Sequence, residues 1–276
     1  MLPIHDMTEQ ELAGIRGVLF DIDDTFTLGG RVTPEAFSAL WKLHDRGFVL
    51  VPITGRPAGW CDHIARMWPV DGVVGENGAF YYWYCEEERR LRRRYVFSPE
   101  QAREKKQALE RIREEVIERV PGAGIASDQP FRLFDLAVDF AEDVPPLGRE
   151  EIEEICGVFA AHRATCKVSS IHVNGWFGNY DKLLMTRLFL TERLGLAWEE
   201  ARDRFIFIGD SPNDEPMFAA FPLSVGVANI ARFIPAMKHP PAFITENEGG
   251  SGFAEVARIV LGRDGSGGGR QKADRG

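Results

Sequence analysis

The stretch GVLFDIDDT at residues 17–25 decides the fold. Its three apolar residues Val18-Leu19-Phe20 stop abruptly at an acid and are too few for a helix, so they predict a buried strand. Further short apolar runs predict strands at residues 48–53, 72–74 and 204–208, with amphipathic helices between them. This alternation of near-continuous apolar strands with helices is typical of a doubly wound α/β fold, in which helices cover both faces of a parallel sheet.

The middle of the chain has a different pattern. Residues 131–140 and 167–174 alternate apolar and polar side chains, and a long charged helix is predicted over residues 99–120. Alternation indicates a sheet with one face covered, and therefore a separate α+β domain inserted into the first. The predicted division is a core domain of residues 1–83 and 179–262, an inserted domain of residues 84–178, and a disordered tail of residues 263–276.

Composition excludes several classes of protein. The chain has 276 residues, 44% of them apolar, with a net charge of −9, which argues against nucleic-acid binding. The four cysteines have no metal-ligand spacing, so we expect reduced thiols. The N-terminus lacks the apolar core of a signal peptide, and no apolar run is long enough for a membrane span. These features predict a cytoplasmic protein with no membrane contact.

Polar clusters interrupt this scaffold, each just past a strand or at the start of a helix. Such edges of α/β sheets bind ligands. In the first cluster, Asp21 and Asp23 are two residues apart, so their carboxylates can converge as a nucleophile and an acid/base, whereas Ile22 points away. The alternative is an ordinary acidic turn.

The other three clusters follow the same logic. Thr54-Gly55-Arg56 suits contacts to phosphate oxygens, or else a turn that caps the next helix. Lys182 stands at an electropositive helix start, where a lysine is unfavourable unless an anion is near. The alternative is a solvated surface lysine. The run Gly209-Asp210-Ser211-Pro212-Asn213-Asp214 gathers oxygen ligands suited to a hard cation, or else caps a helix.

In this order, the segments DIDDT, VPITGRP, Lys182 and FIFIGDSPND resemble the four signature motifs of the haloacid dehalogenase-like hydrolase superfamily. The position of the inserted domain resembles the type IIB (Cof-type) branch with its α/β C2 cap, and Glu76-Asn77-Gly78-Ala79 matches a segment of that branch. The resemblance covers residues 16–262. One departure is Asp24, where glycine is commoner.

The resemblance implies roles for individual residues. Asp21 would be the nucleophile and Asp23 the general acid/base, while Thr54 would bind phosphate and Lys182 would neutralise it. Mg²⁺ would be held by Asp210, the Asp21 carboxylate and the Asp23 carbonyl, with Asn213 and Asp214 in support. Gly55, Arg56 and Asn77 would join Thr54 and Lys182 in binding substrate.

The resemblance also implies the reaction. Dehalogenase members lack an acid at the place of Asp23, so its presence favours a phosphatase that forms an aspartyl-phosphate on Asp21. The expected substrate is a small phosphate ester, and a sugar phosphate is the leading class because type IIB relatives commonly use one. The protein is expected to be a monomer or a homodimer. A phosphosugar mutase or other phosphotransferase, and a non-catalytic phosphate-sensing module, are the alternatives.

Type IIB caps place the open face of their sheet over the active site. Alternation puts Ser170, His172 and Asn174 on that face, with Ile171 and Val173 turned to the cap helices. On the other predicted strand, Leu133, Asp135 and Asp139 would share the open face. We therefore expect His172 and Asn174 to read substrate hydroxyls; the alternative for His172 is a hydrogen bond within an exposed sheet.

Overall fold

The structure, a computed structural model, describes residues 1–169 and 171–262. The chain forms two compact units. Of the described residues, the first contains 1–54, 67–73 and 186–262, and the second contains 55–66 and 74–185. The domain boundaries expected after residues 83 and 178 stay a prediction. No described helix combines the length and apolar composition that a membrane span requires.

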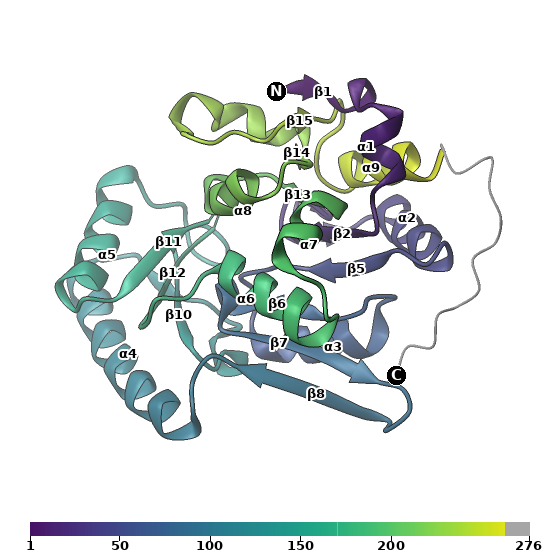
Figure 1. The fold of residues 1–276 in the computed structure, drawn as a ribbon. Helices are drawn as coiled ribbons and strands as arrows, with labels where there is room; N and C mark the ends of the chain where they lie inside the picture. Colours follow the sequence, from purple (N-terminus) through teal and green to yellow (C-terminus); the bar gives the residue numbers. More distant parts are fainter. Residues whose placement is uncertain (170, 263–276) are drawn as a thin grey trace. The chain divides into compact units, whose positions relative to one another are not determined.

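A six-stranded parallel sheet forms the centre of the first unit (Figure 1). Its strands lie in the order β1, β15, β14, β13, β2 and β5, so the two strands that end in acids, β2 and β13, are neighbours. The predicted α/β class with a central parallel sheet is confirmed. The bounds are β1 Leu2–Pro3, β2 Gly17–Phe20, β5 Val49–Pro52, β13 Phe205–Gly209, β14 Ser224–Gly226 and β15 Phe243–Ile244.

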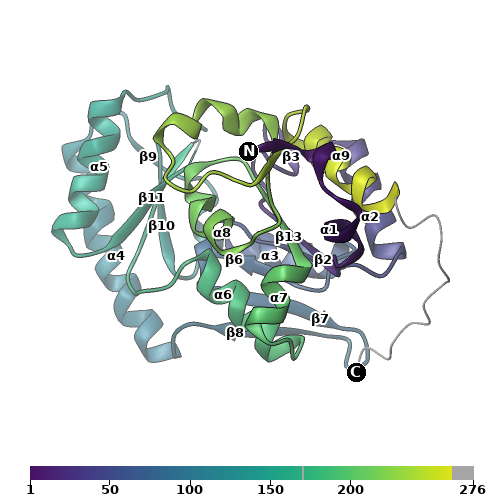
Figure 2. The same ribbon diagram turned by 45° about the horizontal axis from the view of Figure 1, so that its top comes forward.

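Both faces of this sheet are covered, as the unbroken apolar strands predict. On one face Phe20 of β2 packs against Phe253 of α9, with ring centroids 5.0 Å apart, and α2 lies beside α9 (Figure 2). On the other face Phe207 of β13 packs against Phe218 of α8. The helices are α1 Glu9–Ala13, α2 Pro34–Asp45, α7 Trp198–Arg204, α8 Glu215–Ala220 and α9 Gly249–Gly262, and a small hairpin pairs β3 Thr27–Leu28 with β4 Arg31–Val32.

The second unit contains a four-stranded sheet in the order β11, β12, β10 and β9. Leu136, Val138 and Val173 are buried in one apolar cluster with residues of two helices, so the helices cover one face, as alternation predicts (Figure 2). The bounds are β9 Gly124–Ile125, β10 Asp135–Asp139, β11 Thr165–Val168, β12 His172–Trp176, α4 Pro99–Arg119 and α5 Arg149–Ala161.

Two predicted cap strands are shorter than expected. Within the range 131–140 only residues 135–139 form a strand. Residues 129–131 form a 3-10 turn and the N–H groups of Leu133 and Phe134 bind a carboxylate, so Leu133 precedes the strand. The range 167–174 is divided between two antiparallel strands, β11 and β12. Ser170 and the predicted disordered tail of residues 263–276 lie outside the described residues.

One strand belongs to a different sheet from the one we predicted. Residues 72–74 were expected in the central sheet, but β6 (Val73–Gly75) joins a three-stranded sheet with β7 (Phe80–Cys85) and β8 (Arg90–Tyr95). A tight turn follows β6, with positive φ at Glu76, Asn77 and Gly78, and reverses the chain into β7. The long β7–β8 hairpin then extends this separate sheet.

Candidate active site

The carboxyl ends of three neighbouring strands carry predicted site residues of the first unit. The Asp21 N–H donates to the carbonyl of Ile208, 2.9 Å away, so Asp21 lies beside the end of β13. On the other side the N–H of Ile53 donates to the Phe20 carbonyl, which sets Thr54 two residues beyond the end of β5. Asp21, Thr54 and Asp210 are therefore placed by backbone ladders, and all three side chains are buried.

Three carboxylates meet at this edge. Asp21, Asp210 and Asp214 each offer one oxygen within 4.8 Å of the others, and each residue is less than 5% exposed. Buried acids so close together repel one another unless positive charge is supplied. Carboxylate oxygens in a buried cluster are the donors that Mg²⁺ prefers, so these residues fit the ion that the motifs imply.

Asp214 reaches this cluster because Gly209 has no side chain. A Cβ at residue 209 would lie 2.5 Å from Asp214 Oδ2, which is closer than atoms approach. The same oxygen accepts the backbone N–H of Asp210 at 3.2 Å. Asn213 is half-buried beside it, and its Oδ1 accepts the Ser211 hydroxyl at 2.8 Å. The side chains that follow β13 are thus fixed by one another.

Two uncharged side chains hold Asp210. Thr25 donates its hydroxyl to Asp210 Oδ1 at 3.2 Å, and Asn229 donates its amide to Oδ2 at 3.3 Å. Asn229 also donates to the Asp24 carbonyl at 3.0 Å and so bridges the chain segments after β2 and β14. No sequence pattern marks Asn229, which lies in a short 3-10 turn of residues 228–232.

Asp23 and Asp24 lie on a tight turn after Asp21. The Ile22 carbonyl accepts four hydrogen bonds of 2.9 to 3.4 Å, from the N–H groups of Thr25, Phe26 and Thr27 and from the Thr27 hydroxyl. Ile22 is buried, as the alternation predicts, whereas Asp23 is partly exposed. A partly exposed carboxyl two residues from a buried one suits a group that exchanges protons with water.

The backbone explains why glycine is commoner at position 24. Asp24 has φ +55°, in the left-handed region, which costs a typical residue about 1–2 kcal/mol. We expect Asp24→Gly to change the free energy of unfolding by less than about 1 kcal/mol, since relief of that cost offsets the greater freedom of glycine in the unfolded chain. Asp24→Val should destabilise by about 1–3 kcal/mol. Denaturant unfolding of both variants tests this, and equal effects would contradict the backbone explanation.

In the second unit, the turn of residues 76–79 holds the segment that follows Thr54. The Glu76 N–H donates to the Arg56 carbonyl at 3.2 Å, and the Asn77 side chain packs against Gly55. Gly78 has φ +105°, and a Cβ there would lie 2.0 Å from the Asp181 carbonyl, so only glycine fits. The turn thereby touches both the Gly55-Arg56 segment and the start of the next helix.

That helix is α6 (Lys182–Leu188), and Lys182 is its first residue, as predicted. Asp181 caps the helix, because its Oδ1 accepts the Leu184 N–H at 2.7 Å. Lys182 is only 4% exposed. A buried lysine at an electropositive helix start is not the solvated surface residue that was its alternative.

The expected open face of the cap sheet carries His172, Asn174, Asp135 and Asp139, which strand register places on one side. All four are buried. Asp139 is fully engaged by its own turn, since it accepts the N–H groups of residues 141, 142 and 143. Asn174 donates its amide to Asp135 at 3.2 Å.

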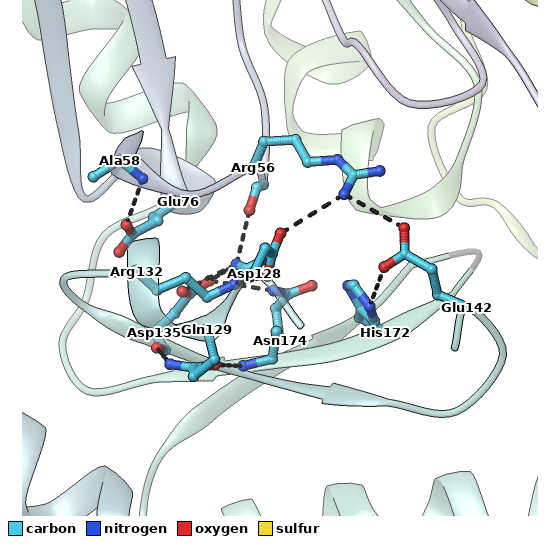
Figure 3. Close-up of polar contacts among 12 residues, drawn as sticks. Arg56, Ala58, Glu76, Asp128, Gln129, Arg132, Asp135, Glu142, His172 and Asn174 are labelled. Carbon is cyan, nitrogen blue, oxygen red and sulfur yellow. Dashed lines mark hydrogen bonds and ion pairs between the residues drawn. The ribbon is translucent and has the colours of Figure 1, made fainter. Parts of the chain in front are cut away.

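Glu142 links this face to Arg56 (Figure 3). Its Oε1 lies 3.7 Å from Arg56 Nη1, and its Oε2 lies 2.9 Å from His172 Nε2, without the alignment of a hydrogen bond. Arg56 also covers the ring of Trp60. Burial and then nearby Arg132 lower the pKa of His172 to about 4, so its ring is uncharged near neutral pH. The predicted site residues thus come together in two groups, one in each unit.

This fold and these motifs match known proteins. Residues 18–118 match a family model described as haloacid dehalogenase-like hydrolase. No match was found among curated proteins. Over these residues the match supports the resemblance to haloacid dehalogenase-like hydrolases that the motifs indicate.

Solved structures share the fold. A HAD/COF-like hydrolase of Plasmodium vivax is 16% identical, with a TM-score of 0.66, over 92% of this chain and 99% of that one. A protein of Thermoplasma acidophilum is 18% identical, with a TM-score of 0.68, over 89% and 98%. The sucrose-phosphatase of Synechocystis, solved with sucrose and phosphate, is 15% identical, with a TM-score of 0.62, over 89% and 98%.

Proposed function

We propose that the protein is a Mg²⁺-dependent phosphatase that removes phosphate from a small metabolite through an aspartyl-phosphate on Asp21. The observation that carries this proposal is the buried cluster of Asp21, Asp210 and Asp214 at the ends of adjacent parallel strands. Three carboxylates in this arrangement suit a divalent cation and a phosphate, and a purely structural role does not explain their burial together.

In the proposed mechanism Asp21 attacks the phosphorus atom, and the ester oxygen leaves with a proton from Asp23. Asp23 then takes a proton from the water that hydrolyses the aspartyl-phosphate. Bound Mg²⁺ would offset the repulsion between the Asp21 carboxylate and the phosphate dianion. Asp21, Asp210 and the Asp23 carbonyl would hold the ion, supported by Asn213 and Asp214.

Further groups bind the phosphate in this proposal. Thr54 would donate its hydroxyl to a phosphate oxygen, together with the amides of Gly55 and Arg56. Lys182, which belongs to the second unit, enters the proposal on its motif and on its burial. Asn77 would stabilise the Gly55-Arg56 segment, because its side chain contacts Gly55.

The direct test is release of inorganic phosphate from an aryl phosphate such as p-nitrophenyl phosphate. We expect release with Mg²⁺, loss of the activity with EDTA and its return when Mg²⁺ is added back. A chain that binds phosphate but releases none under these conditions would be a sensing module. Transfer of phosphate to a second sugar hydroxyl, in place of release, would identify a mutase.

We further propose that the substrate is a sugar phosphate whose hydroxyls contact His172 and Asn174. A sucrose-phosphatase shares the fold, and an uncharged imidazole beside an amide can both donate to and accept from hydroxyls. A cytoplasmic location and a monomeric or homodimeric state stay predictions.

The substitution His172→Ala tests this assignment. Loss of one hydrogen bond should lower kcat/KM for the preferred sugar phosphate by about tenfold, while kcat/KM for p-nitrophenyl phosphate should stay within about twofold, because the phosphate chemistry is untouched. His162→Ala is the matched control, since His162 pairs with Glu115 on the helical side of the same unit. A screen of sugar phosphates checks the ranking, and an unchanged ranking would remove His172 from the site.

A further inference from the structure

Arg132 is a buried charge of the second unit with several hydrogen-bond partners, and the proposed mechanism does not use it. Its side chain is 1% exposed. Its Nε and Nη2 donate to the two oxygens of Asp128 at 2.9 and 3.1 Å, and its Nη1 donates to both oxygens of Asp135. Nη1 also donates to the backbone carbonyl of Gly55 at 3.0 Å.

The hydrogen bond to the Gly55 carbonyl also determines the orientation of the neighbouring Arg56 N–H. A trans peptide is planar, so the carbonyl of Gly55 and the N–H of Arg56 point in opposite directions. No described peptide is cis. A donor that fixes the carbonyl therefore fixes the direction of the N–H as well. That N–H belongs to the segment Thr54-Gly55-Arg56, whose amides the proposed function assigns to phosphate binding.

We propose that Arg132 is a positioning residue that orients the Gly55-Arg56 peptide for phosphate binding. The inference rests on the proposed function, because it assigns Arg132 to the phosphate site of that reaction. Without the guanidinium the Gly55 carbonyl loses this donor, and the peptide is free to rotate toward other partners. The Arg56 N–H would then spend less time in the orientation that a phosphate oxygen requires.

Arg132 is itself held rigidly, as a positioning group must be. Asp128 and Asp135 both form ion pairs with the planar guanidinium of Arg132. An arginine can donate several hydrogen bonds in one plane to two carboxylates, and a lysine cannot. The next two residues are also fixed, because the Glu76 carboxylate accepts the N–H groups of Leu133 at 2.9 Å and Phe134 at 2.6 Å. The other Glu76 contact, from the Ala58 N–H at 3.0 Å, ties the start of α3 (Ala58–Met67) to the same carboxylate.

The turn of residues 76–79 also fixes the peptide that follows Arg56. The Arg56 carbonyl accepts the Glu76 N–H, so consecutive carbonyls of the segment are held by Arg132 and by the turn of residues 76–79. Burial raises the pKa of Glu76 to about 8, while its bonds from the Leu133 and Phe134 amides act in the opposite direction. The segment after Thr54 is thus clamped by groups more than 18 residues away in the sequence.

The alternative is that Arg132 only neutralises two buried acids. Both roles predict lower stability when the arginine is removed, because Asp128 and Asp135 would stay buried and uncompensated. Only the positioning role predicts a selective loss of phosphate affinity in a variant that still folds and still binds Mg²⁺.

The experiment compares Arg132→Lys with Arg119→Lys. Arg119 is also an arginine of this unit with two acidic partners, Glu115 and Glu154, but it lies on the exposed surface. The Kd values of inorganic phosphate and of Mg²⁺ are measured by calorimetry, beside the thermal midpoint. We expect Arg132→Lys to raise the phosphate Kd about tenfold, as loss of one oriented hydrogen bond does, and to leave the Mg²⁺ Kd within about twofold.

A second variant keeps the inference testable if the lysine variant does not fold. Arg132→Gln combined with Asp135→Asn removes a cation and an anion together, so the net charge is unchanged, and Asp128 keeps Arg56 Nη1 at 3.7 Å as a cationic neighbour. The glutamine side chain at position 132 is too short to reach the Gly55 carbonyl. We expect its phosphate Kd to rise at least as much as that of Arg132→Lys. Arg119→Lys should move neither constant.

The outcomes separate this inference from the function on which it rests. A folded Arg132 variant that binds phosphate as the wild type does would overturn the positioning role and leave the phosphatase intact. Parallel weakening of phosphate and Mg²⁺, in step with the thermal midpoint, would assign Arg132 a structural role only. If the wild type binds no phosphate and releases none from p-nitrophenyl phosphate, both proposals fail.

Discussion

Asp21→Asn is expected to lower kcat for p-nitrophenyl phosphate by about 10⁴-fold or more, because a carboxamide cannot serve as the nucleophile. The substitution keeps the size and shape of the side chain, so the fold should persist. In the absence of divalent cation, the thermal midpoint should stay the same or rise, since one of three clustered buried carboxylates becomes neutral. Loss of activity with no loss of stability is the expected signature.

Asp45→Asn is the matched control, because Asp45 is an exposed carboxylate of the same unit, at the end of α2. Its activity should match that of the wild type. Trapping ³²P from labelled substrate on the protein gives an independent readout, with label on the wild type and none on Asp21→Asn. Turnover by the Asp21 variant at more than about a tenth of the wild-type rate, far above the loss expected for a nucleophile, would refute the covalent role.

The central sheet could be predicted because its signals are local. Apolar runs that stop at an acid marked the ends of β2 and β13, and backbone ladders then bring Asp21 and Asp210 to one edge. The start of α2 is also determined locally. Thr33 precedes a proline, which favours a helix N-cap at this position, and its hydroxyl accepts the Ala36 N–H. Here the residues that decide the structure are neighbours in the chain.

Other features depend on contacts that no local pattern records. Arg132 meets Gly55 across 77 positions of the sequence, and Asn229 meets Asp24 across 205. The order of strands is also set by pairing over distance, which is why β6 was assigned to the wrong sheet. Glu142 was missed for the same reason, because only the fold brings it to Arg56 and His172.

The backbone conformation of Asp24 accounts for the departure from the motif at position 24. The motif identified an acid at a position where glycine is commoner. The positive φ of Asp24 shows that its backbone adopts a conformation that glycine tolerates best. Its N–H donates to the Thr27 hydroxyl at 3.0 Å, and its carbonyl accepts from Asn229, so the backbone of this residue helps to hold the turn.

Asp23→Asn is expected to lower kcat/KM for an alkyl phosphate, such as a sugar phosphate, by about 10²–10⁴-fold, the range of general acid catalysis. The loss should be smaller for p-nitrophenyl phosphate, because nitrophenolate leaves readily without a proton. Asp23 lies on the turn fixed by the Ile22 carbonyl and is partly exposed, so an amide at this position should leave the fold unchanged.

The second half-reaction makes the test sharper. Hydrolysis of the aspartyl-phosphate needs Asp23 as a base even when the leaving group needs no acid, so the variant should show a burst of nitrophenolate that is stoichiometric with the enzyme, followed by slow turnover. Asp24→Asn, at the neighbouring acid, should show neither effect. Equal losses for alkyl and aryl substrates, with no burst, would mean that the Asp23 side chain does not transfer the proton.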